Sequence, residues 1–313
     1  MNTDIADLYV SRTERGSAII ARQEPVVYHQ GNYAQALNEQ QLERYAKDGF
    51  LVIENLFDEH EVQELLAELE RLRLDPALKG MPELITEPGD QDALRSLFRV
   101  HQLSDRMAEL IRDPRLVNVA RQVLGSEVYV HQSRVNMKPG LYGKEFFWHS
   151  DFETWHIEDG MPNMRAVSCS LLLTDNNEHN GPLMLVPGSH RQFIACEGAT
   201  PDENYKSSLK VQTVGTPDEV SLKLLIDNGG LESVRAKAGS VIFFECNTMH
   251  ASSGNLSPWA RSNVFTVFNS VENKLEAPRN GLAPRPEYLA ARQHTDTIVP
   301  ATELEPDELL MVG

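Results

Sequence analysis

The sequence predicts a mainly β protein with flanking helices, an α+β arrangement in which an antiparallel sandwich or jelly roll forms the core. Two observations support this fold class. Helical patterns occupy the first part of the chain, whereas beyond residue 126 the apolar residues recur with a period close to two. Clusters of Gly, Pro, Asn and Asp separate these later segments, which favours turns between antiparallel strands over βαβ crossovers.

Three helices are expected before most of the strands. A capping box starts each of the first two, Asn38 with Gln41 and Asp58 with Glu61, because each pair can satisfy free amide groups of a first turn. The third is expected over residues 114–124, which begin with proline and precede a glycine. The expected strands are residues 50–53, 127–137, 164–173, 182–186, 240–246 and 262–271.

The chain is expected to divide into an arm and one domain. Residues 1–35 show no clear periodicity, so we expect them to form an N-terminal arm. Residues 36–313 carry the helical and strand patterns and are expected to form a single domain. A chain of 313 residues is long enough to bury a substantial core in this way.

Charge and cysteine content limit the partners and the compartment. The net charge of −17 would repel phosphate groups, so nucleic acids and anionic membranes are not expected partners. No segment approaches the roughly 18 consecutive apolar residues that cross a bilayer, and the N-terminus has no secretory apolar region. Three cysteines without a CxxC pair fit a reducing compartment. We therefore expect a soluble, cytoplasmic protein.

The central motif is a pair of residues, His149 and Asp151, followed about a hundred positions later by His250. Two imidazoles and one carboxylate can occupy one face of an octahedral metal, which suits Fe(II) and leaves open positions for 2-oxoglutarate and O2. If the segment is extended, the spacing of two residues sends both side chains to the same side. The alternative for a single His-x-Asp triplet is a surface turn or a core histidine.

Two further features favour the metal site over that alternative. Arg261 opens the alternating run 262–268, so a guanidinium can point from a barrel strand and hold a carboxylate through two hydrogen bonds. In the strand before the triad, six side chains are expected on one face, and four of them are polar. A solvent-exposed face is the alternative explanation for this strand. The six residues are Val128, Val130, Gln132, Arg134, Asn136 and Lys138.

At these residues the sequence resembles a known family. The unbroken run FFWHSDFETWH at 146–156, together with EDGMP at 158–162, NGPL at 180–183 and VPGSH at 186–190, is similar to the signature of ectoine hydroxylases. These enzymes belong to the phytanoyl-CoA dioxygenase superfamily. The similarity extends from about Leu42 to Arg292, without departure at the metal-binding positions.

The resemblance implies a double-stranded β-helix, cupin-like, that converts L-ectoine to 5-hydroxyectoine in compatible-solute metabolism, and it implies a homodimer. It implies Fe(II) as the metal, with 2-oxoglutarate and O2 as co-substrates, and an arginine, Arg279 or Arg285, for the ectoine carboxylate. The implied iron-binding and catalytic residues are His149, Asp151 and His250. The implied 2-oxoglutarate contacts are Lys138 and Arg261, and the implied ectoine contacts are Gln132, Trp155, Phe146 and Phe265.

Three other functions remain open at this level. A related hydroxylase could act on another small polar metabolite, because fold and iron site do not set the substrate. A catalytically silent cupin-like binding protein could keep the same barrel. A halogenase would need a small residue in place of the carboxylate ligand, and Asp151 argues against it. Among the other histidines, His156 is expected to hydrogen-bond near the site, and His131 to be structural or exposed.

Overall fold

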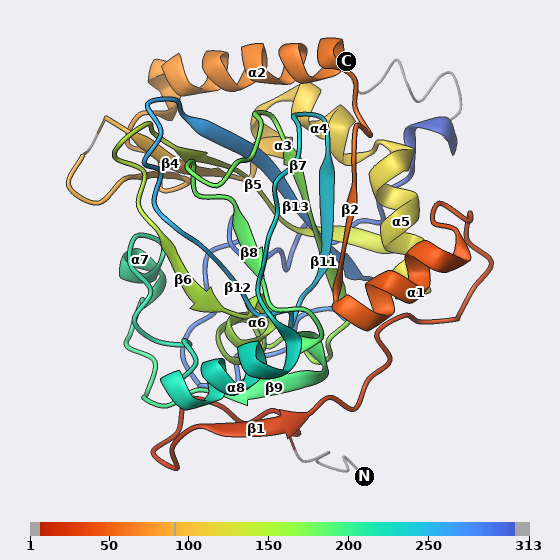
Figure 1. Cartoon of the computed structure of the whole chain (residues 1–313), viewed down its shortest axis with the longest axis vertical. Helices are drawn as coiled ribbons and strands as arrows, with labels where there is room; N and C mark the ends of the chain where they lie inside the picture. The colour runs from red at the N-terminus through yellow and green to blue at the C-terminus, as the bar shows by residue number, and fades with distance from the viewer. Residues whose placement is uncertain (1–6, 91, 304–313) are drawn as a thin grey trace.

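The fold is built on two antiparallel sheets that face each other (Figure 1). The structure is a computed structural model and describes residues 7–90 and 92–303. The larger sheet runs β2 (Phe50–Ile53), β11 (Val241–Glu245), β7 (Ala166–Leu172), β13 (Arg261–Ser270), β5 (Val128–Lys138), β4 (Leu94–Phe98) and β3 (Leu84–Thr86). The smaller sheet runs β10 (Glu232–Ser233), β8 (Leu183–Leu185), β12 (His250–Ser252) and β6 (Phe146–His149).

The pairing pattern confirms the predicted jelly roll. Neighbouring strands in both sheets are antiparallel, including pairs far apart in sequence such as β11 with β2 and β13 with β5. Strands β3 and β4 were not predicted, because they precede the segment where the alternating pattern becomes clear. Residues 1–6 and 304–313, at the ends of the predicted arm and domain, lie outside the described residues.

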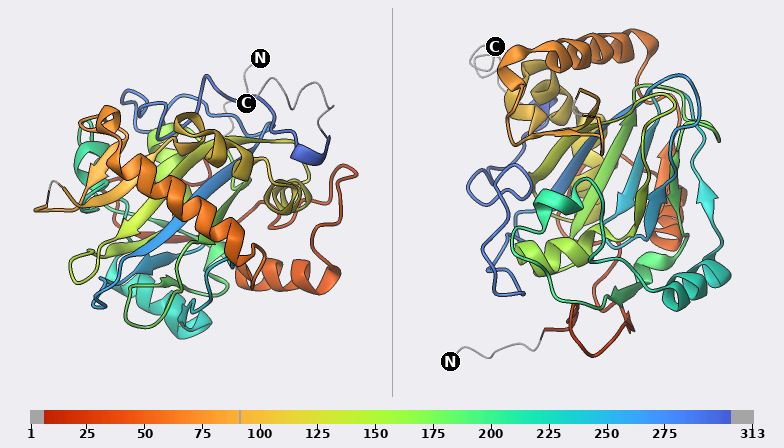
Figure 2. Two further views of the ribbon diagram at one scale, coloured as in Figure 1. Left: turned by 90° about the horizontal axis from the view of Figure 1, so that it is seen from above. Right: turned by 90° about the vertical axis from the view of Figure 1, so that its left-hand side faces the viewer.

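Helices from the first part of the chain cover the outer face of the larger sheet. They include the three that were predicted, and the capping boxes at Asn38 and Asp58 are present with both of their hydrogen bonds. Seen from above, α2 crosses over the sheet (Figure 2). The helices are α1 (Glu39–Asp48), α2 (Glu59–Leu74), α3 (Val100–Leu103), α4 (Asp105–Ile111), α5 (Pro114–Leu124), α6 (Asp151–Asp159), α7 (Tyr205–Ser208) and α8 (Glu219–Gly229), with single 3₁₀ turns at Pro76–Leu78, Ser189–Arg191 and Ala301–Glu303.

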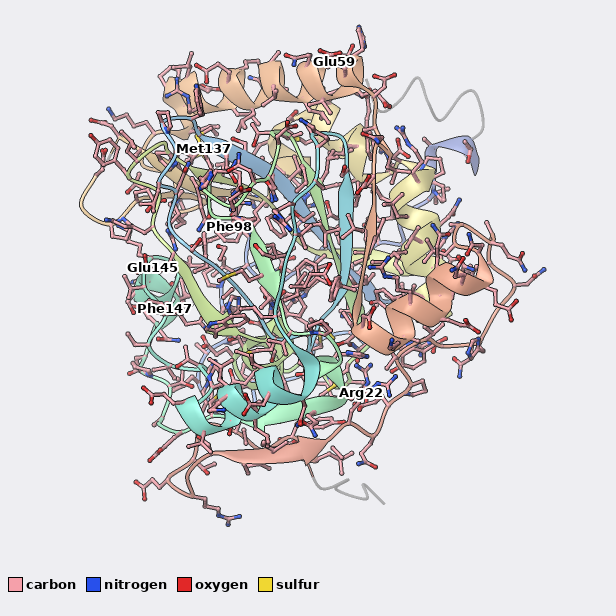
Figure 3. All side chains as sticks on the ribbon, viewed as in Figure 1. Arg22, Glu59, Phe98, Met137, Glu145 and Phe147 are labelled. Carbon is pink, nitrogen blue, oxygen red and sulfur yellow. The ribbon has the colours of Figure 1, made fainter. Side chains whose placement is uncertain are left out.

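Two apolar layers hold the sheets and helices together. The outer layer packs α2, α4 and α5 on the larger sheet through residues such as Leu65, Val117 and Phe243. The inner layer fills part of the space between the sheets and includes Leu185 and Phe244. Figure 3 shows the described side chains on this framework. The remaining inner positions are polar, so the barrel encloses a partly polar interior next to β5, β6 and β12.

The predicted single face of β5 is wrong for its first part. The pairing with β13 passes from Val267 opposite Gln132 to Phe268 opposite Val130, so His131 is an extra residue, a β-bulge. The bulge reverses the alternation. Val128 and Val130 therefore face the outer helices, whereas Gln132 faces inward, and the His131 ring packs on Trp155 inside the barrel.

The N-terminal segment contains a strand that the sequence pattern did not reveal. Strand β1 (Ala18–Ala21) pairs with β9 (Gln192–Ala195) at one end of the molecule (Figure 1). Tyr9, which precedes it, is 1% exposed and packs between Phe152 and Phe193. Much of this segment is therefore packed on the barrel. The periodicity of the sequence could not predict strand β1, because a strand of four residues depends on its partner strand.

Two expectations from composition can be compared with the structure. Within the described residues, no helix combines the length and apolarity that a bilayer crossing requires. The three cysteines, Cys169, Cys196 and Cys246, are buried and carry free thiols.

We predict that acid destabilises the metal-free chain through its buried histidines. Burial, and then the nearby Arg285 and Arg292, lower the pKa of His131 to about 3, and burial lowers the pKa of His101 to about 4, from an ordinary value of 6.5. As pH falls below 6.5 the unfolded chain binds protons that the folded chain does not. The contribution of these two histidines to the free energy of unfolding is therefore full above pH 6.5 and is lost as pH falls from 6.5 to about 4 for His101 and about 3 for His131.

Urea denaturation at pH 7 and pH 5 tests this. His131→Leu is expected to reduce the loss of unfolding free energy between these pH values by about 2 kcal/mol. His60→Leu is the control, because the side chain of His60 is 82% exposed. Equal pH dependence in both variants would contradict the prediction.

Candidate active site

The pairing of β6 with β12 places the two predicted histidine ligands side by side. His149 is the last residue of β6 and His250 the first of β12, and they are opposite each other in the ladder. Asp151 is the first residue of α6, whereas an extended segment was considered for it from the sequence. The helix starts at this point because the Ser150 side chain caps it, accepting a hydrogen bond from the Glu153 amide. Ligand atoms of the three residues all lie within 4.8 Å of one another.

Hydrogen bonds to the backbone orient both imidazoles for a metal. Nδ1 of His149 donates to the Phe147 carbonyl at 2.6 Å, and Nδ1 of His250 donates to the Thr248 carbonyl at 2.9 Å. The unprotonated Nε2 of each ring is then the metal-binding atom. Burial, followed by the neighbouring His250, lowers the pKa of His149 to about 4, which keeps the ring neutral. This donor set fits Fe(II).

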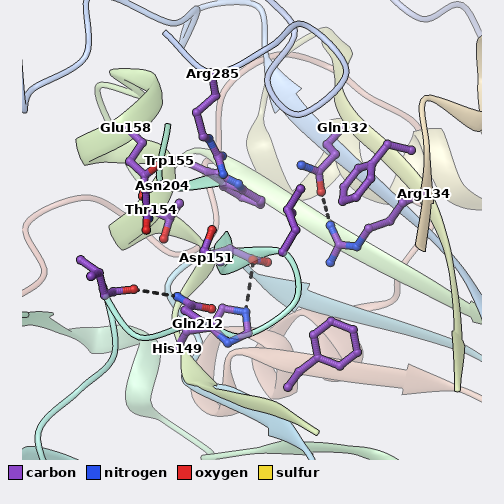
Figure 4. Close-up of a pocket in the computed structure, with 15 residues that line it drawn as sticks. Gln132, Arg134, His149, Asp151, Thr154, Trp155, Glu158, Asn204, Gln212 and Arg285 are labelled. Carbon is purple, nitrogen blue, oxygen red and sulfur yellow. Dashed lines mark hydrogen bonds and ion pairs between the residues drawn. The ribbon is translucent and has the colours of Figure 1, made fainter. Parts of the chain in front are cut away.

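Two cavities meet at this triad. The larger has a volume of about 110 Å³ and the smaller about 40 Å³, and both are lined by Arg134, Phe146 and His149. The larger is also lined by Phe98, Gln132, Asp151, Thr154, Trp155, Glu158, Asn204, Ser208, Leu209, Gln212, Val214 and Arg285 (Figure 4). The smaller is also lined by Asn136, Leu183, His250, Ala251, Ser252, Arg261 and Phe265.

The smaller cavity is strongly electropositive. Arg261 is 4% exposed and Lys138 is fully buried, and their backbones are partners in the β13–β5 ladder. Within the described residues, neither has a carboxylate at ion-pair distance. Burial lowers the pKa of Arg261 to about 10, and burial together with Arg261 lowers the pKa of Lys138 to about 6. Buried cations without anions are costly, so this cavity is suited to a negatively charged ligand.

The local contacts of the two cations differ. The Lys138 ammonium donates to the carbonyl groups of Ser252 and Ser253 and lies 5.2 Å from the centre of the Phe146 ring. It lines neither cavity. Arg261 does line the smaller cavity, and its Nε has no hydrogen-bond partner among the described residues.

The predicted substrate residues divide between the cavities. Gln132, Trp155 and Phe146 line the larger one, whereas Phe265 lines only the smaller one. Of the two candidate arginines, Arg285 lines the larger cavity. Arg279 lines neither and instead binds Glu276 at the surface. Arg285 points into the cavity region close to Trp155 (Figure 4).

Several lining residues were not predicted to belong to the site. Arg134 was placed on the polar face of β5, and that position alone could have identified it. Thr154 and Glu158 lie within the signature run, where the helical spacing of 151, 154, 155 and 158 would have grouped them on one face. Asn204 and Gln212 come from an irregular segment with no motif, and no local signal could have identified them.

Comparisons with known proteins show the family of this chain. The model of the family described as phytanoyl-CoA dioxygenase (PhyH) matches residues 45–263. "Ectoine dioxygenase" of Bordetella bronchiseptica is 62% identical over 299 residues, covering 96% of this chain and 97% of that protein. "Ectoine dioxygenase" of Stutzerimonas stutzeri is 51% identical over 289 residues, covering 92% of this chain and 95% of that protein.

Solved structures are also similar to this chain along most of its length. The crystal structure of EctD from S. alaskensis with 2-oxoglutarate and 5-hydroxyectoine has a TM-score of 0.84 and 43% sequence identity, and the match covers 93% of this chain and 97% of that one. The structure of that protein with bound Fe has a TM-score of 0.83 at the same identity, covering 94% of this chain and 97% of that one. With the family model spanning most of the chain and relatives aligned along nearly all of it, this chain belongs to the phytanoyl-CoA dioxygenase family and groups with its ectoine dioxygenases.

Proposed function

We propose that this protein hydroxylates L-ectoine to 5-hydroxyectoine, using 2-oxoglutarate and O2 and releasing succinate and CO2. The observation that carries the proposal is the triad of His149, Asp151 and His250 beside a buried arginine that lacks a carboxylate partner among the described residues. An iron site needs the first feature, and a dicarboxylate co-substrate needs the second. The activity of the relatives supplies the choice of ectoine.

His149, Asp151 and His250 would hold Fe(II), with the two imidazoles binding through Nε2. When bound, iron supplies the oxidative chemistry that uses O2 to decarboxylate 2-oxoglutarate and to place one oxygen atom on the substrate. The protein holds the ligands in place. The two Nδ1 hydrogen bonds fix the rings, and the Ser168 hydroxyl lies 3.4 Å from Asp151 Oδ2, where it can donate a weak hydrogen bond.

The smaller cavity binds 2-oxoglutarate in this proposal. The Arg261 guanidinium meets the carboxylate distant from iron, because its fork of donors matches two oxygens. Lys138 lies beside Arg261 but outside the cavity lining, so it contributes positive charge to the 2-oxoglutarate site without a direct contact to the ligand. A bound dicarboxylate would raise the lowered pKa values of both cations towards their ordinary values, since each would gain an opposite charge.

The larger cavity binds ectoine. Trp155 and Phe146 provide aromatic surfaces against which the delocalised amidinium ring can lie by cation–π attraction, and Gln132 provides a polar contact. Arg285 uses Nε and Nη2 to bind Asp159, which leaves Nη1 to meet the ectoine carboxylate. These contacts hold the ring at the triad and displace water from the reacting carbon.

The finer expectations about assembly and location also stay proposals. A cytoplasmic location is supported by the three buried free thiols. The homodimer rests on the family resemblance, and sedimentation measurements would test it. The division into an arm of residues 1–35 and a domain of residues 36–313 is a description of folding units, which limited proteolysis would test.

The function itself is tested by turnover with purified chain, Fe(II), 2-oxoglutarate and ectoine. We expect a product that is one oxygen atom heavier than ectoine, with an equal amount of succinate. Proline and an acyl-CoA serve as competing substrates, and hydroxylation of either in preference to ectoine would favour a related hydroxylase. No succinate under any of these conditions would favour a binding protein.

The metal site is tested by measuring the Fe(II) affinity of variants that lack one ligand. His250→Ala and Asp151→Ala each remove one of three ligands. We expect their Fe(II) affinity, measured anaerobically by calorimetry, to fall by more than the roughly 10- to 100-fold that loss of an outer partner causes. His179→Ala is the control, since the His179 side chain is 72% exposed. Normal iron retention in His250→Ala would refute the assignment.

The assignment of the two cavities is tested by a pair of variants. Arg261→Ala should raise the KM for 2-oxoglutarate about 10- to 100-fold, because hydrogen bonds to a charged group are lost, with a smaller effect on ectoine. Trp155→Ala should raise the KM for ectoine about tenfold with a smaller effect on 2-oxoglutarate. Exchange of the two effects would show that the cavities are assigned the wrong way round.

A further inference from the structure

The N-terminal segment packs on α6, the helix that begins with Asp151. Helix α6 carries Asp151 in its first turn and presents Thr154, Trp155 and Glu158 to the larger cavity. Tyr9 packs on Phe152 of this helix. The segment formed by residues 7–24, called the arm segment here, reaches this position because β1 pairs with β9. The arm segment therefore packs on a helix that bears both a proposed metal ligand, Asp151, and a proposed substrate-binding residue, Trp155.

Arg12 is the centre of this contact. Its Nε and Nη2 bind the two carboxylate oxygens of Glu153 at 3.0 and 2.7 Å, and Nη1 binds Glu158. Nη2 also donates to the Thr154 hydroxyl at 3.0 Å and Nη1 to the Thr200 hydroxyl at 3.1 Å. The Arg12 side chain is 1% exposed. One guanidinium thus binds polar side chains of three α6 residues and the hydroxyl of a neighbouring loop.

The same guanidinium also connects α6 to the irregular wall of the larger cavity. Glu158 accepts a bond from Asn204 at 2.9 Å, and Asn204 lines the cavity. A Cβ atom on Gly215 would lie 2.4 Å from Arg12 Nη2, so the loop after Val214 passes directly over the guanidinium. Arg12 is therefore in contact with α6, which lines the larger cavity, and with Thr200 and Gly215, which are close in sequence to the lining residues Asn204 and Val214.

The backbone of Arg12 adopts a conformation that side chains disfavour. Its φ of 57° lies in the left-handed region, which an arginine occupies only when surrounding contacts require it. The Arg12 amide donates to the Cys196 carbonyl at 2.7 Å, and the Ser11 hydroxyl donates to Glu153 at 2.7 Å. Strained backbone together with a fully buried charge is unusual for a segment whose only role is packing.

Stability alone is a weak explanation for this arrangement. Burying an ion pair removes two charges from water, and apolar replacements of similar volume are often neutral or stabilising. A network in which every donor of a planar guanidinium is bound does, however, define the direction of each partner. The orientation that matters here is that of α6, because this helix carries Asp151 and Trp155.

We propose that Arg12 is a positioning residue for the active site: it fixes the orientation of α6, and through it the placement of Asp151 and Trp155 relative to bound substrate. This inference rests on the proposed function and adds to it a residue from the arm segment, about 140 positions away in sequence. Loss of the network would leave ectoine bound in a less exact position. In a larger share of turnovers, decarboxylation of 2-oxoglutarate would then transfer no oxygen to ectoine, and ascorbate added to the assay as reductant would supply the two electrons that, with two protons from water, release that oxygen atom as water.

The test compares Arg12→Met with Arg15→Met in the full chain. Both remove one positive charge from the arm segment, but Arg15 is exposed, and its backbone amide, not its side chain, makes its contact, with Thr13. Arg12→Lys keeps the charge and loses the fork, and it is the variant to use if Arg12→Met does not fold. The measurements are the melting temperature, anaerobic Fe(II) affinity by calorimetry, KM for each co-substrate, and hydroxylated product per succinate.

We expect Arg12→Met to lower kcat/KM for ectoine about tenfold or more and to lower product per succinate, with KM for 2-oxoglutarate unchanged. Its Fe(II) affinity should fall, because Asp151 begins the helix that is released, and Arg12→Lys should lie between it and wild type. Arg15→Met should match wild type in all of these. A merely structural residue would lower the melting temperature without changing product per succinate.

Two results would overturn the inference. One is equal product per succinate and equal KM for ectoine in Arg12→Met and Arg15→Met, whatever their melting temperatures. The other is failure of both Arg12 variants to fold, which would make Arg12 a requirement for folding and not for placement. Failure of the proposed function is a separate result, because it would appear in the wild-type chain as the absence of hydroxylated ectoine.

Discussion

The pairing of β6 with β12 is the constraint on which the rest of the site depends. It sets His149 opposite His250, although about a hundred residues separate them in sequence. The ladder fixes the two backbones, and carbonyl groups of the same strands and turns fix the rings. Asp151 follows because the chain turns into α6 just after β6. A metal centre formed in this way is as rigid as the sheet that carries it.

Charge distribution gives the two cavities their different characters. Around the larger cavity, Glu158 and Asp159 are paired with Arg12 and Arg285, so charge is largely balanced within the protein. Around the smaller one, Arg261 has no carboxylate partner among the described residues. Because an unpaired buried charge is costly, the smaller cavity is complete only with an anion, whereas the larger cavity is suited to a ligand of little net charge, such as a zwitterion.

Helix α6 joins these features. Its first residue belongs to the metal centre, its middle turn lines the substrate cavity, and Glu153 binds the arm segment. The β-bulge at His131 has a related effect on the facing strand, since it turns that ring inward against Trp155. Trp155 therefore packs against His131 of the bulged strand, and the helix that carries Trp155 is bound by Arg12.

The sequence by itself determined the helix starts at Asn38 and Asp58, the later strands, and the triad motif, because capping, alternation and short motifs are local patterns. Tertiary structure alone decided which way each part of β5 faces, since a bulge depends on the partner strand. It also decided that Asn204 lines the larger cavity and that Arg12 binds α6. Those contacts join segments far apart in the chain, and no periodicity within either segment records them.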